Sequence, residues 1–240
     1  MVLRTFADLS SLSRAAAELF ARLAAEAVST RGRFSVALSG GSTPRRTYEI
    51  LAQPPFREEI PWDRLHVFWG DERCVAPDDP LSNARMVREA LLAHVPLPRT
   101  QIHPIFCQTS PEAGARDYEV LLRDFFGEMR PRLDLVFLGL GDNGHTASLF
   151  PGDAALAAKD RWTAAVHHPE AKLPRITLTA PLINQAAAVV FLVAGGAKAG
   201  ALGEVLHGPH DPRRLPAQLI KPENGELYWL VDREAAARLP

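Results

Sequence analysis

A histidine in a glycine-rich segment is the first candidate for chemistry in this chain. The segment GLGDNGH, residues 139–145, follows an apolar run at residues 133–138 and ends at His145. The ordinary pKa of histidine lies close to neutrality, which suits acid–base catalysis. A lone histidine more often serves structure, but a position on a glycine loop at a strand end favours function. We predict a functional role for His145, whose tautomer Asp142 and Asn143 could set.

A second segment has the residue types of an anion site. The apolar run at residues 34–38 is followed by Ser39, Gly40, Gly41, Ser42, Thr43 and Pro44. Glycine backbone, hydroxyl groups and the free N–H groups at the start of a helix favour a phosphate. The same residues would also suit a tight turn in which Ser42 or Thr43 is an ordinary N-cap. The segment is not a Walker motif, because no Gly-Lys-Ser/Thr follows.

Charged residues follow a third apolar run, at residues 65–69. Asp71, Glu72 and Arg73 come directly after this run and Gly70. A surface cluster of charges is the simplest interpretation. At the carboxyl end of a strand, however, a carboxylate beside an arginine can orient a sugar hydroxyl or stabilise developing negative charge.

Lysine is scarce, so its positions are informative. Lys198 begins a helical pattern after the apolar run at residues 188–194, while Lys172 and Arg175 flank a proline before another strand pattern. Each of these residues alone is most simply a solvated charge. Their convergence at one edge of a sheet would favour binding of an anion.

Two other interpretations of these motifs are rejected. The glycines of residues 139–145 match the dinucleotide-binding pattern G-x-G-x-x-G, but Pro151 and Gly152 interrupt the segment before a crossover helix could form. His207 and His210 have the spacing of metal ligands, yet no third ligand lies nearby in the sequence. We therefore predict no dinucleotide site and an exposed position for both histidines.

The candidate segments lie between predicted strands and helices. Strands are predicted at residues 34–38, 65–69, 133–138, 175–179, 188–194 and 227–231, and helices at residues 12–27, 43–51, 82–94, 111–129, 198–206 and 233–239. This alternation predicts a single α/β domain over residues 1–240, with a mostly parallel central sheet and helices on both faces. Ligands of such sheets bind beyond the carboxyl ends of the strands, where these segments would meet.

Length and composition exclude several classes of partner. The chain has 240 residues, with 27 Lys plus Arg against 28 Asp plus Glu and a net charge of -1, which argues against nucleic acid or an anionic membrane as main partner. Its longest apolar run, residues 186–197, is shorter than the ~20 residues of a membrane span. Cys74 and Cys107 offer no disulfide framework, so we expect a reduced, cytoplasmic protein.

Taken together, these segments resemble the 6-phosphogluconolactonase family, which shares a superfamily with glucosamine-6-phosphate deaminase. The matching segments follow family order: SGGSTP (39–44), WGDERCV (69–75), the later helix that starts at Ser82 and Asn83, GLGDNGHTASLFPG (139–152), KLPRITLT (172–179), AGGAKAGAL (194–202) and PAQLI (216–220). The stretch HTASLFPG is highly specific. The resemblance implies a single Rossmann-like α/β domain that acts as a monomer. It also implies hydrolysis of 6-phosphoglucono-1,5-lactone to 6-phosphogluconate in the oxidative pentose phosphate pathway, without metal or cofactor.

The resemblance also implies roles for single residues. His145 would be the general base that activates a water, Arg73 would contact the substrate near its reacting end, and Asp71 would orient hydroxyls. The phosphate would be held by Gly40, Gly41, Ser42, Thr43 and Lys198, with further positive charge from Lys172 and Arg175. A lactone is an activated ester, so attack by a deprotonated water needs no covalent nucleophile.

The residue before the Gly-His pair departs from the family pattern. The family commonly has Asp there, whereas this chain has Asn143. An Asn carbonyl can accept a hydrogen bond from the histidine Nδ1 but brings no charge, and a comparable Asp to Asn change in a serine-protease triad costs about 10⁴ in kcat. We predict that Asn143 orients His145 and that activity survives.

Two alternative functions follow from the same fold. A glucosamine-6-phosphate deaminase or similar isomerase needs carboxylates around the histidine, and its loop carries a Glu five residues after that histidine. This chain has Phe150 at that position and Asn143 in place of the Asp. A non-catalytic sugar-phosphate sensor would need an attached DNA-binding module, for which the chain has neither spare length nor a basic patch.

Overall fold

Parallel strands form the main sheet of the computed structural model, which describes residues 1–127 and 129–240. The strand order is β1 (Val2–Phe6), β9 (Glu226–Asp232), β8 (Ala188–Val193), β5 (Leu135–Leu138), β2 (Phe34–Leu38) and β3 (Leu65–Trp69). Every residue of β2, β5 and β8 is buried, so both faces of the sheet centre are covered. The predicted α/β fold with a mostly parallel sheet is confirmed.

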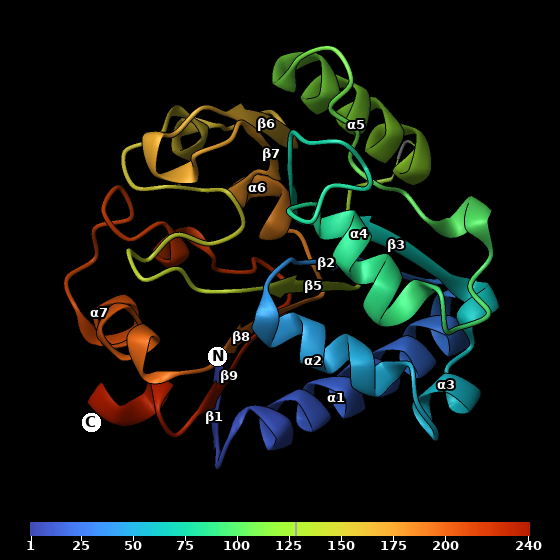
Figure 1. Ribbon diagram of the computed structural model, residues 1–240, viewed down its shortest axis with the longest axis horizontal. Helices are drawn as coiled ribbons and strands as arrows, with labels where there is room; N and C mark the ends of the chain where they lie inside the picture. The colour runs from blue at the N-terminus through green and yellow to red at the C-terminus, as the bar shows by residue number, and fades with distance from the viewer. Residues whose placement is uncertain (128) are drawn as a thin grey trace.

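Helices cover this sheet and alternate with its strands (Figure 1). The longest, α1 (Leu9–Arg31), contacts four strands of the sheet and lies beside α2 (Ser42–Leu51). It ends at Gly32, the predicted stop, whose φ of 73° suits a glycine C-cap. The others are α3 (Phe56–Glu59), α4 (Asn83–Val87), α5 (Pro111–Phe126), α6 (Ala180–Ile183) and α7 (Ala199–His207). Within the described ranges, none of the helices is long and apolar enough to cross a membrane.

Three predicted helices differ in extent. The pattern at residues 82–94 becomes α4 followed by a π-helical turn, Arg88–Leu92. The pattern at residues 233–239 forms only a 3₁₀ turn, Ala235–Arg238. It stops at Leu239, which is extended, as is favoured for a residue before a proline. The pattern at residues 111–129 ends at Phe126, and Glu128 lies outside the described residues.

A second, smaller sheet is antiparallel and has three strands. It contains β4 (Asp71–Arg73), β7 (Arg175–Leu178) and β6 (Thr163–Val166), and α5 packs against it. In its register Arg73 stands opposite Arg175, which brings two guanidinium-bearing residues together. The predicted strand at residues 175–179 therefore belongs to this sheet and not to the parallel one. The sequence did not reveal β4, whose three residues are charged, or β6, which is half alanine.

Two buried tyrosines hold the ends of β2 and β3. The Tyr48 hydroxyl accepts from the backbone N–H of Ser39 at 3.0 Å and donates to its carbonyl at 2.9 Å. The Tyr118 hydroxyl does the same at Trp69, accepting at 2.9 Å and donating at 3.3 Å. Each tyrosine satisfies the backbone N–H and carbonyl of a residue at which a strand passes into a loop, so the loops that follow start from fixed positions.

The two cysteines are paired. Cys74 and Cys107 form a disulfide, with 5.1 Å between their Cα atoms. The expectation that both cysteines are reduced is therefore wrong for this structure. The pairing joins residues 33 apart in the sequence, and neither local pattern indicated it. It connects the loop that follows Arg73 to the segment before α5.

Candidate active site

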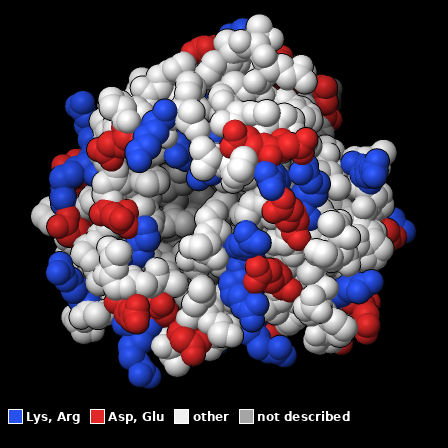
Figure 2. Space-filling view, viewed as in Figure 1, with Lys and Arg blue, Asp and Glu red and all other residues white. Residues whose placement is uncertain are grey.

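A cavity of about 230 Å³ lies beyond the ends of β2, β5 and β8. The small antiparallel sheet bounds it on the other side through Asp71, Arg73 and Arg175. Figure 2 shows a hollow near the centre of this face, with Lys and Arg side chains at its rim. The cavity thus occupies the position at which parallel α/β sheets bind ligands.

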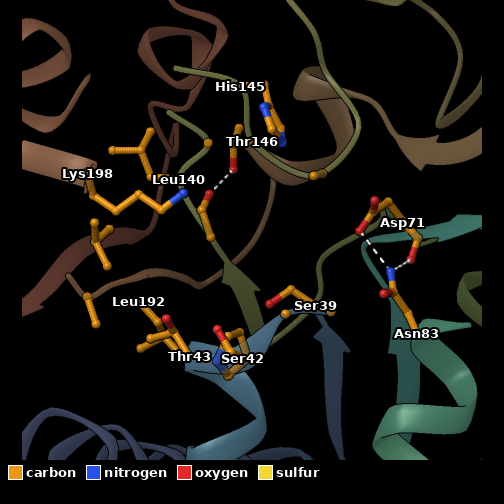
Figure 3. Close-up of a pocket in the computed structure, with 18 of the residues that line it drawn as sticks. Ser39, Ser42, Thr43, Asp71, Asn83, Leu140, His145, Thr146, Leu192 and Lys198 are labelled. Atoms are coloured by element: carbon orange, nitrogen blue, oxygen red, sulfur yellow. Dashed lines mark hydrogen bonds between the residues drawn. The ribbon is translucent and has the colours of Figure 1, made fainter. Parts of the chain in front are cut away.

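Most of the predicted site residues meet at this cavity. Those that line it are Gly40, Gly41, Ser42, Thr43, Asp71, Arg73, His145, Arg175 and Lys198. Figure 3 shows Ser42 and Thr43 on one side of it, His145 on the opposite side, Lys198 on a third and Asp71 on a fourth. Asn143 lies behind His145, where it contacts the imidazole.

Lys172 is not among the lining residues of the cavity. It ends the 3₁₀ turn Pro169–Ala171 with a left-handed φ of 59°, and it is exposed to solvent. Arg175, only three residues later, is held on β7 with a side chain that is 16% exposed. Of these two cations, the structure brings only Arg175 to the cavity. His207 and His210 are exposed, as predicted.

The helix α2 begins at the cavity with an uncapped N-terminus. Its N-cap is Gly41, whose φ of 109° favours glycine, and no side chain of the described residues caps the helix. The alternative in which Ser42 or Thr43 is an ordinary N-cap is therefore wrong. The first N–H groups of the helix stay available to an anion. Gly40 is required as well, because a Cβ there would lie 1.8 Å from the Asn83 Oδ1.

Lys198 extends from the turn after β8 toward the loop after β5 (Figure 3). Its Nζ is paired with the Oδ1 of Asp142. The Lys198 side chain is 29% exposed and the Asp142 side chain 69% exposed. Asp142 therefore neutralises the cation at this end of the cavity, and of Asp142 and Asn143 it is Asn143 that hydrogen-bonds the His145 ring.

The contacts of Asn143 determine the tautomer of His145. The Asn143 Oδ1 accepts from the backbone N–H of His145 at 3.1 Å, and its Nδ2 donates to the Glu170 carboxylate. A backbone N–H can only donate and a carboxylate can only accept, so the amide has one orientation. The same Oδ1 lies 2.7 Å from the Nδ1 of His145, which must therefore carry the proton. The Nε2 of His145 is left with a free lone pair.

The surroundings of His145 lower its pKa. Burial is the largest cause, Asp71 opposes it, Arg175 and Lys198 lower the pKa further, and Glu170 raises it. The imidazole is therefore neutral near pH 7 and able to accept a proton. Its ring stacks on Phe150 with 4.5 Å between centroids. Gly141 leaves room for it, since a Cβ there would lie 2.0 Å from the Nδ1.

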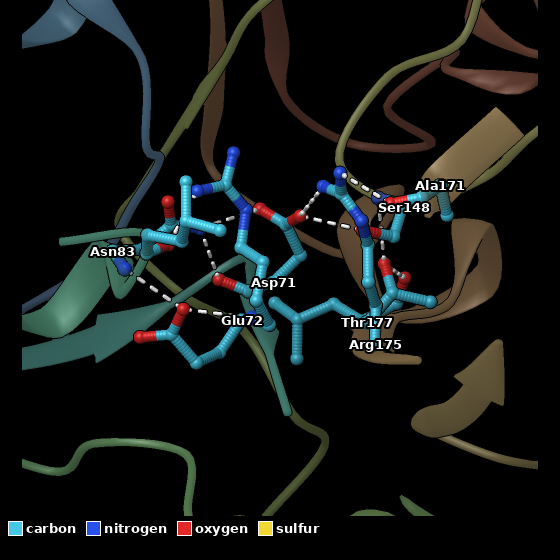
Figure 4. Close-up of polar contacts among 10 residues, drawn as sticks. Asp71, Glu72, Asn83, Ser148, Ala171, Arg175 and Thr177 are labelled. Atoms are coloured by element: carbon cyan, nitrogen blue, oxygen red, sulfur yellow. Dashed lines mark hydrogen bonds and ion pairs between the residues drawn. The ribbon is translucent and has the colours of Figure 1, made fainter. Parts of the chain in front are cut away.

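Asp71 is the centre of a buried polar network (Figure 4). It is 5% exposed, accepts from the Ser148 hydroxyl at 2.6 Å and from the Asn83 amide at 3.4 Å, and lies 3.7 Å from the Arg175 guanidinium. The network joins β4, β7, α4 and the loop after β5. Its carboxylate therefore keeps Arg175 and the loop of His145 in place.

Glu72 anchors the segment that follows Arg73. It is buried, and its carboxylate accepts from the backbone N–H groups of Asn83 at 2.8 Å and Ala84 at 2.7 Å. Burial raises its pKa. Arg73 is held in turn by a 2.5 Å bond from its Nη1 to the Leu81 carbonyl. The two interactions position the Arg73 guanidinium at the cavity wall.

The sequence analysis assigned no role of their own to four residues that support this site. Three of them are buried: Glu72, Asn83 and Ser148. Ser148 and Asn83 lie within segments that carry the family resemblance, and burial of a hydroxyl or an amide is the signal that marks them. Glu170 has no local signal, since it reaches Asn143 across 27 residues of sequence.

Comparisons with known proteins cover almost the whole chain. Residues 7–229 match the family described as glucosamine-6-phosphate isomerases/6-phosphogluconolactonase. A 6-phosphogluconolactonase of Synechocystis sp. is 48% identical over 219 residues, covering 89% of this chain and 88% of the relative, and one of Nostoc sp. is 46% identical over 218 residues, with the same coverage. A solved 6-phosphogluconolactonase from Leishmania guyanensis superposes with a TM-score of 0.85 at 30% identity, over 100% of this chain and 98% of that one.

Proposed function

The chain belongs to the glucosamine-6-phosphate isomerase/6-phosphogluconolactonase family, and we propose that it hydrolyses 6-phosphoglucono-1,5-lactone to 6-phosphogluconate. The observation that carries this proposal is His145, a neutral imidazole with a free Nε2 that faces a cavity whose other end suits a phosphate. A base and an anion site at opposite ends of one cavity fit a substrate that has a lactone at one end and a phosphate at the other.

In the proposed reaction His145 activates water. Its Nε2 takes a proton as the water oxygen bonds to the lactone carbonyl carbon, and the carbonyl electrons move to the oxygen. When the carbonyl re-forms, the bond to the ring oxygen breaks and the imidazolium returns its proton to that oxygen. The products are a free hydroxyl and a carboxylic acid. Such base catalysis contributes on the order of 10²- to 10⁴-fold.

Positive charge beside His145 suits the oxyanion that forms during attack. Arg73 and Arg175 stand opposite each other in the small sheet, and both line the cavity. We assign Arg73 to the substrate near its reacting end, with Asp71 keeping the neighbouring groups in place. A donor aimed at an oxyanion contributes about 10²- to 10³-fold, because it is already oriented before the charge develops.

The phosphate binds at the other end of the cavity in this proposal. The free N–H groups at the start of α2, the Ser42 and Thr43 hydroxyls and the Lys198 ammonium would hold it. Fixing the phosphate places the lactone carbonyl before His145, so this end contributes to turnover as well as to affinity.

The surroundings of His145 favour a lactonase over a deaminase. Deaminases of this superfamily carry a carboxylate five residues after the histidine. Here that residue is Phe150, which is buried and stacks on His145. An apolar ring cannot shuttle protons between sugar carbons, whereas hydrolysis needs only one base. We also propose that the chain acts as a monomer, since one chain supplies all the residues assigned here.

The test is the rate of 6-phosphogluconate formation from lactone that is generated in situ, measured against a blank without enzyme. We expect acceleration by the purified chain, loss of that acceleration in His145→Ala, and no loss in His210→Ala, which removes an exposed histidine outside the cavity. No acceleration by the unmodified chain would reject the lactonase. Binding of 6-phosphogluconate without turnover would instead support a sensor.

A further inference from the structure

The Asn143 amide is held by a carboxylate on its far side. Its Nδ2 donates to the Glu170 Oε2, while its Oδ1 accepts from both the backbone N–H and the ring Nδ1 of His145. Glu170, Asn143 and His145 therefore form a chain of hydrogen bonds that ends at the base. The proposed reaction uses His145, whose tautomer Asn143 sets, and leaves Glu170 without a role.

Glu170 lies in a segment that is itself fixed relative to His145. This segment is the 3₁₀ turn Pro169–Ala171, whose backbone N–H at Glu170 bonds to the His168 Nδ1 at 3.3 Å. The His168 ring stacks on Phe150 with 4.9 Å between centroids and 5° between planes. Phe150 also stacks on His145, so one aromatic stack sets the spacing between the base and the turn that carries Glu170.

The charge of Glu170 matters because Asn143 has none. The charged groups that act on His145 are Asp71 on β4, Arg175 on β7, Lys198 at the start of α7 and Glu170. The two cations oppose protonation of the imidazole, and the Asp71 carboxylate is already engaged by Ser148 and Asn83. Glu170 is the carboxylate that reaches the imidazole through its own hydrogen-bond partner.

We propose that Glu170 is a positioning residue for the base, acting through Asn143. Its carboxylate holds the Asn143 amide in the orientation that leaves the His145 Nε2 free, and its charge stabilises the imidazolium that forms during hydrolysis. The chain thereby replaces a carboxylate in direct contact with the histidine by a neutral amide and a carboxylate one step further away. The effect of Glu170 on turnover rests on the proposed function. Its effect on the tautomer of His145 rests on the geometry alone.

The first test removes Glu170 and follows kcat. We expect Glu170→Ala to lower kcat by about 3- to 10-fold, the range for one ordinary intramolecular hydrogen bond, because Glu170 acts on the base only through Asn143. Glu170→Gln keeps an acceptor for the Asn143 amide but loses the charge, so we expect a smaller loss. A matched control is Glu112→Ala, which removes an exposed glutamate that pairs with the surface His167. Full activity in Glu170→Ala would overturn the proposal.

The second test replaces the amide that contacts His145 by a carboxylate. Asn143→Asp places a carboxylate directly against His145, and Glu170 then faces a like charge. In that background we expect Glu170→Ala to cost nothing or to raise kcat. A positioning role predicts that the loss of kcat caused by Glu170→Ala disappears or becomes a gain in the Asn143→Asp background. A merely structural role predicts the same loss of kcat in both backgrounds. The same loss in both would overturn the proposal.

A third measurement needs no substrate. Nitrogen-15 NMR of the His145 ring, assigned by comparison with His145→Gln, reports which nitrogen carries the proton and at which pH the ring titrates. We expect the Nδ1–H form in the unmodified chain and titration at a lower pH in Glu170→Ala, because a negative charge favours the protonated ring. An unchanged titration would overturn the inference. Absence of lactonase activity with the Nδ1–H form intact would reject only the proposed function.

Discussion

The two ends of the cavity are built in different ways. The phosphate end uses the backbone of one continuous segment, residues 39–44, together with one lysine. The reacting end uses side chains that are far apart in the sequence: Asp71 and Ser148 are 77 residues apart, and Asn143 and Glu170 are 27 apart. A backbone site depends on local conformation, whereas a side-chain network depends on the packing of both sheets. Substitutions should therefore separate the two ends.

The largest effect should come from the reacting end. His145→Gln keeps a polar side chain of similar size but removes the base, so we expect kcat to fall by about 10²- to 10⁴-fold while KM changes little. Steady-state kinetics of lactone hydrolysis measure both values. A large rise in KM with kcat unchanged would place His145 in binding and would remove the distinction between the two ends.

The phosphate end should show a smaller effect with a different signature. Lys198→Ala removes the cation there, and a hydrogen bond of a charged group is worth about 1.5–3 kcal/mol, so kcat/KM should fall by roughly 10- to 10²-fold. A lactone without the phosphate should show no such difference between the variant and the unmodified chain. An equal loss with that lactone would contradict a phosphate role.

The two tyrosine contacts allow a matched comparison. Tyr48→Phe removes the bonds at Ser39 beside the phosphate loop, and Tyr118→Phe removes the equivalent bonds at Trp69 beside Asp71. We expect each to lower the free energy of unfolding by about 1–3 kcal/mol, because each leaves backbone groups unpaired. We further expect Tyr48→Phe to raise KM and Tyr118→Phe to lower kcat. The same kinetic effect in both variants would argue against separate ends.

The smallest effect should be a gain. Asp142 neutralises Lys198 in the structure, so Asp142→Asn should free the ammonium for the phosphate. Exposed ion pairs are worth about 0.2–1 kcal/mol, so we expect KM to fall by no more than about 5-fold. A rise in KM would show that Asp142 orients Lys198 and does not compete for it.

The same contrast explains what the sequence could predict. Five of the six strands of the parallel sheet and the glycine stop of α1 follow from local patterns, and the structure confirms them. The edge strand β1 was not predicted, and the phosphate role of residues 39–44 stays a prediction. The charged strand β4, the pairing of Cys74 with Cys107 and the contact between Glu170 and Asn143 depend on segments that meet only in three dimensions. Lys172 was expected to supply positive charge to the phosphate, but it is exposed at the end of the turn Pro169–Ala171 and does not line the cavity.

The most direct test of the account is the pH dependence of kcat/KM for the unmodified chain and for His145→Gln, each corrected for spontaneous hydrolysis. Burial and two cations lower the pKa of His145, and the neutral ring is the base. Activity should therefore rise with pH, reach half its plateau below the ordinary histidine pKa of about 6.5 and stay level above it. The residual activity of His145→Gln should lack this rise of kcat/KM from acidic pH to the plateau. The same rise of kcat/KM in that variant, or a midpoint above the ordinary histidine pKa in the unmodified chain, would contradict the assignment of His145 as the base.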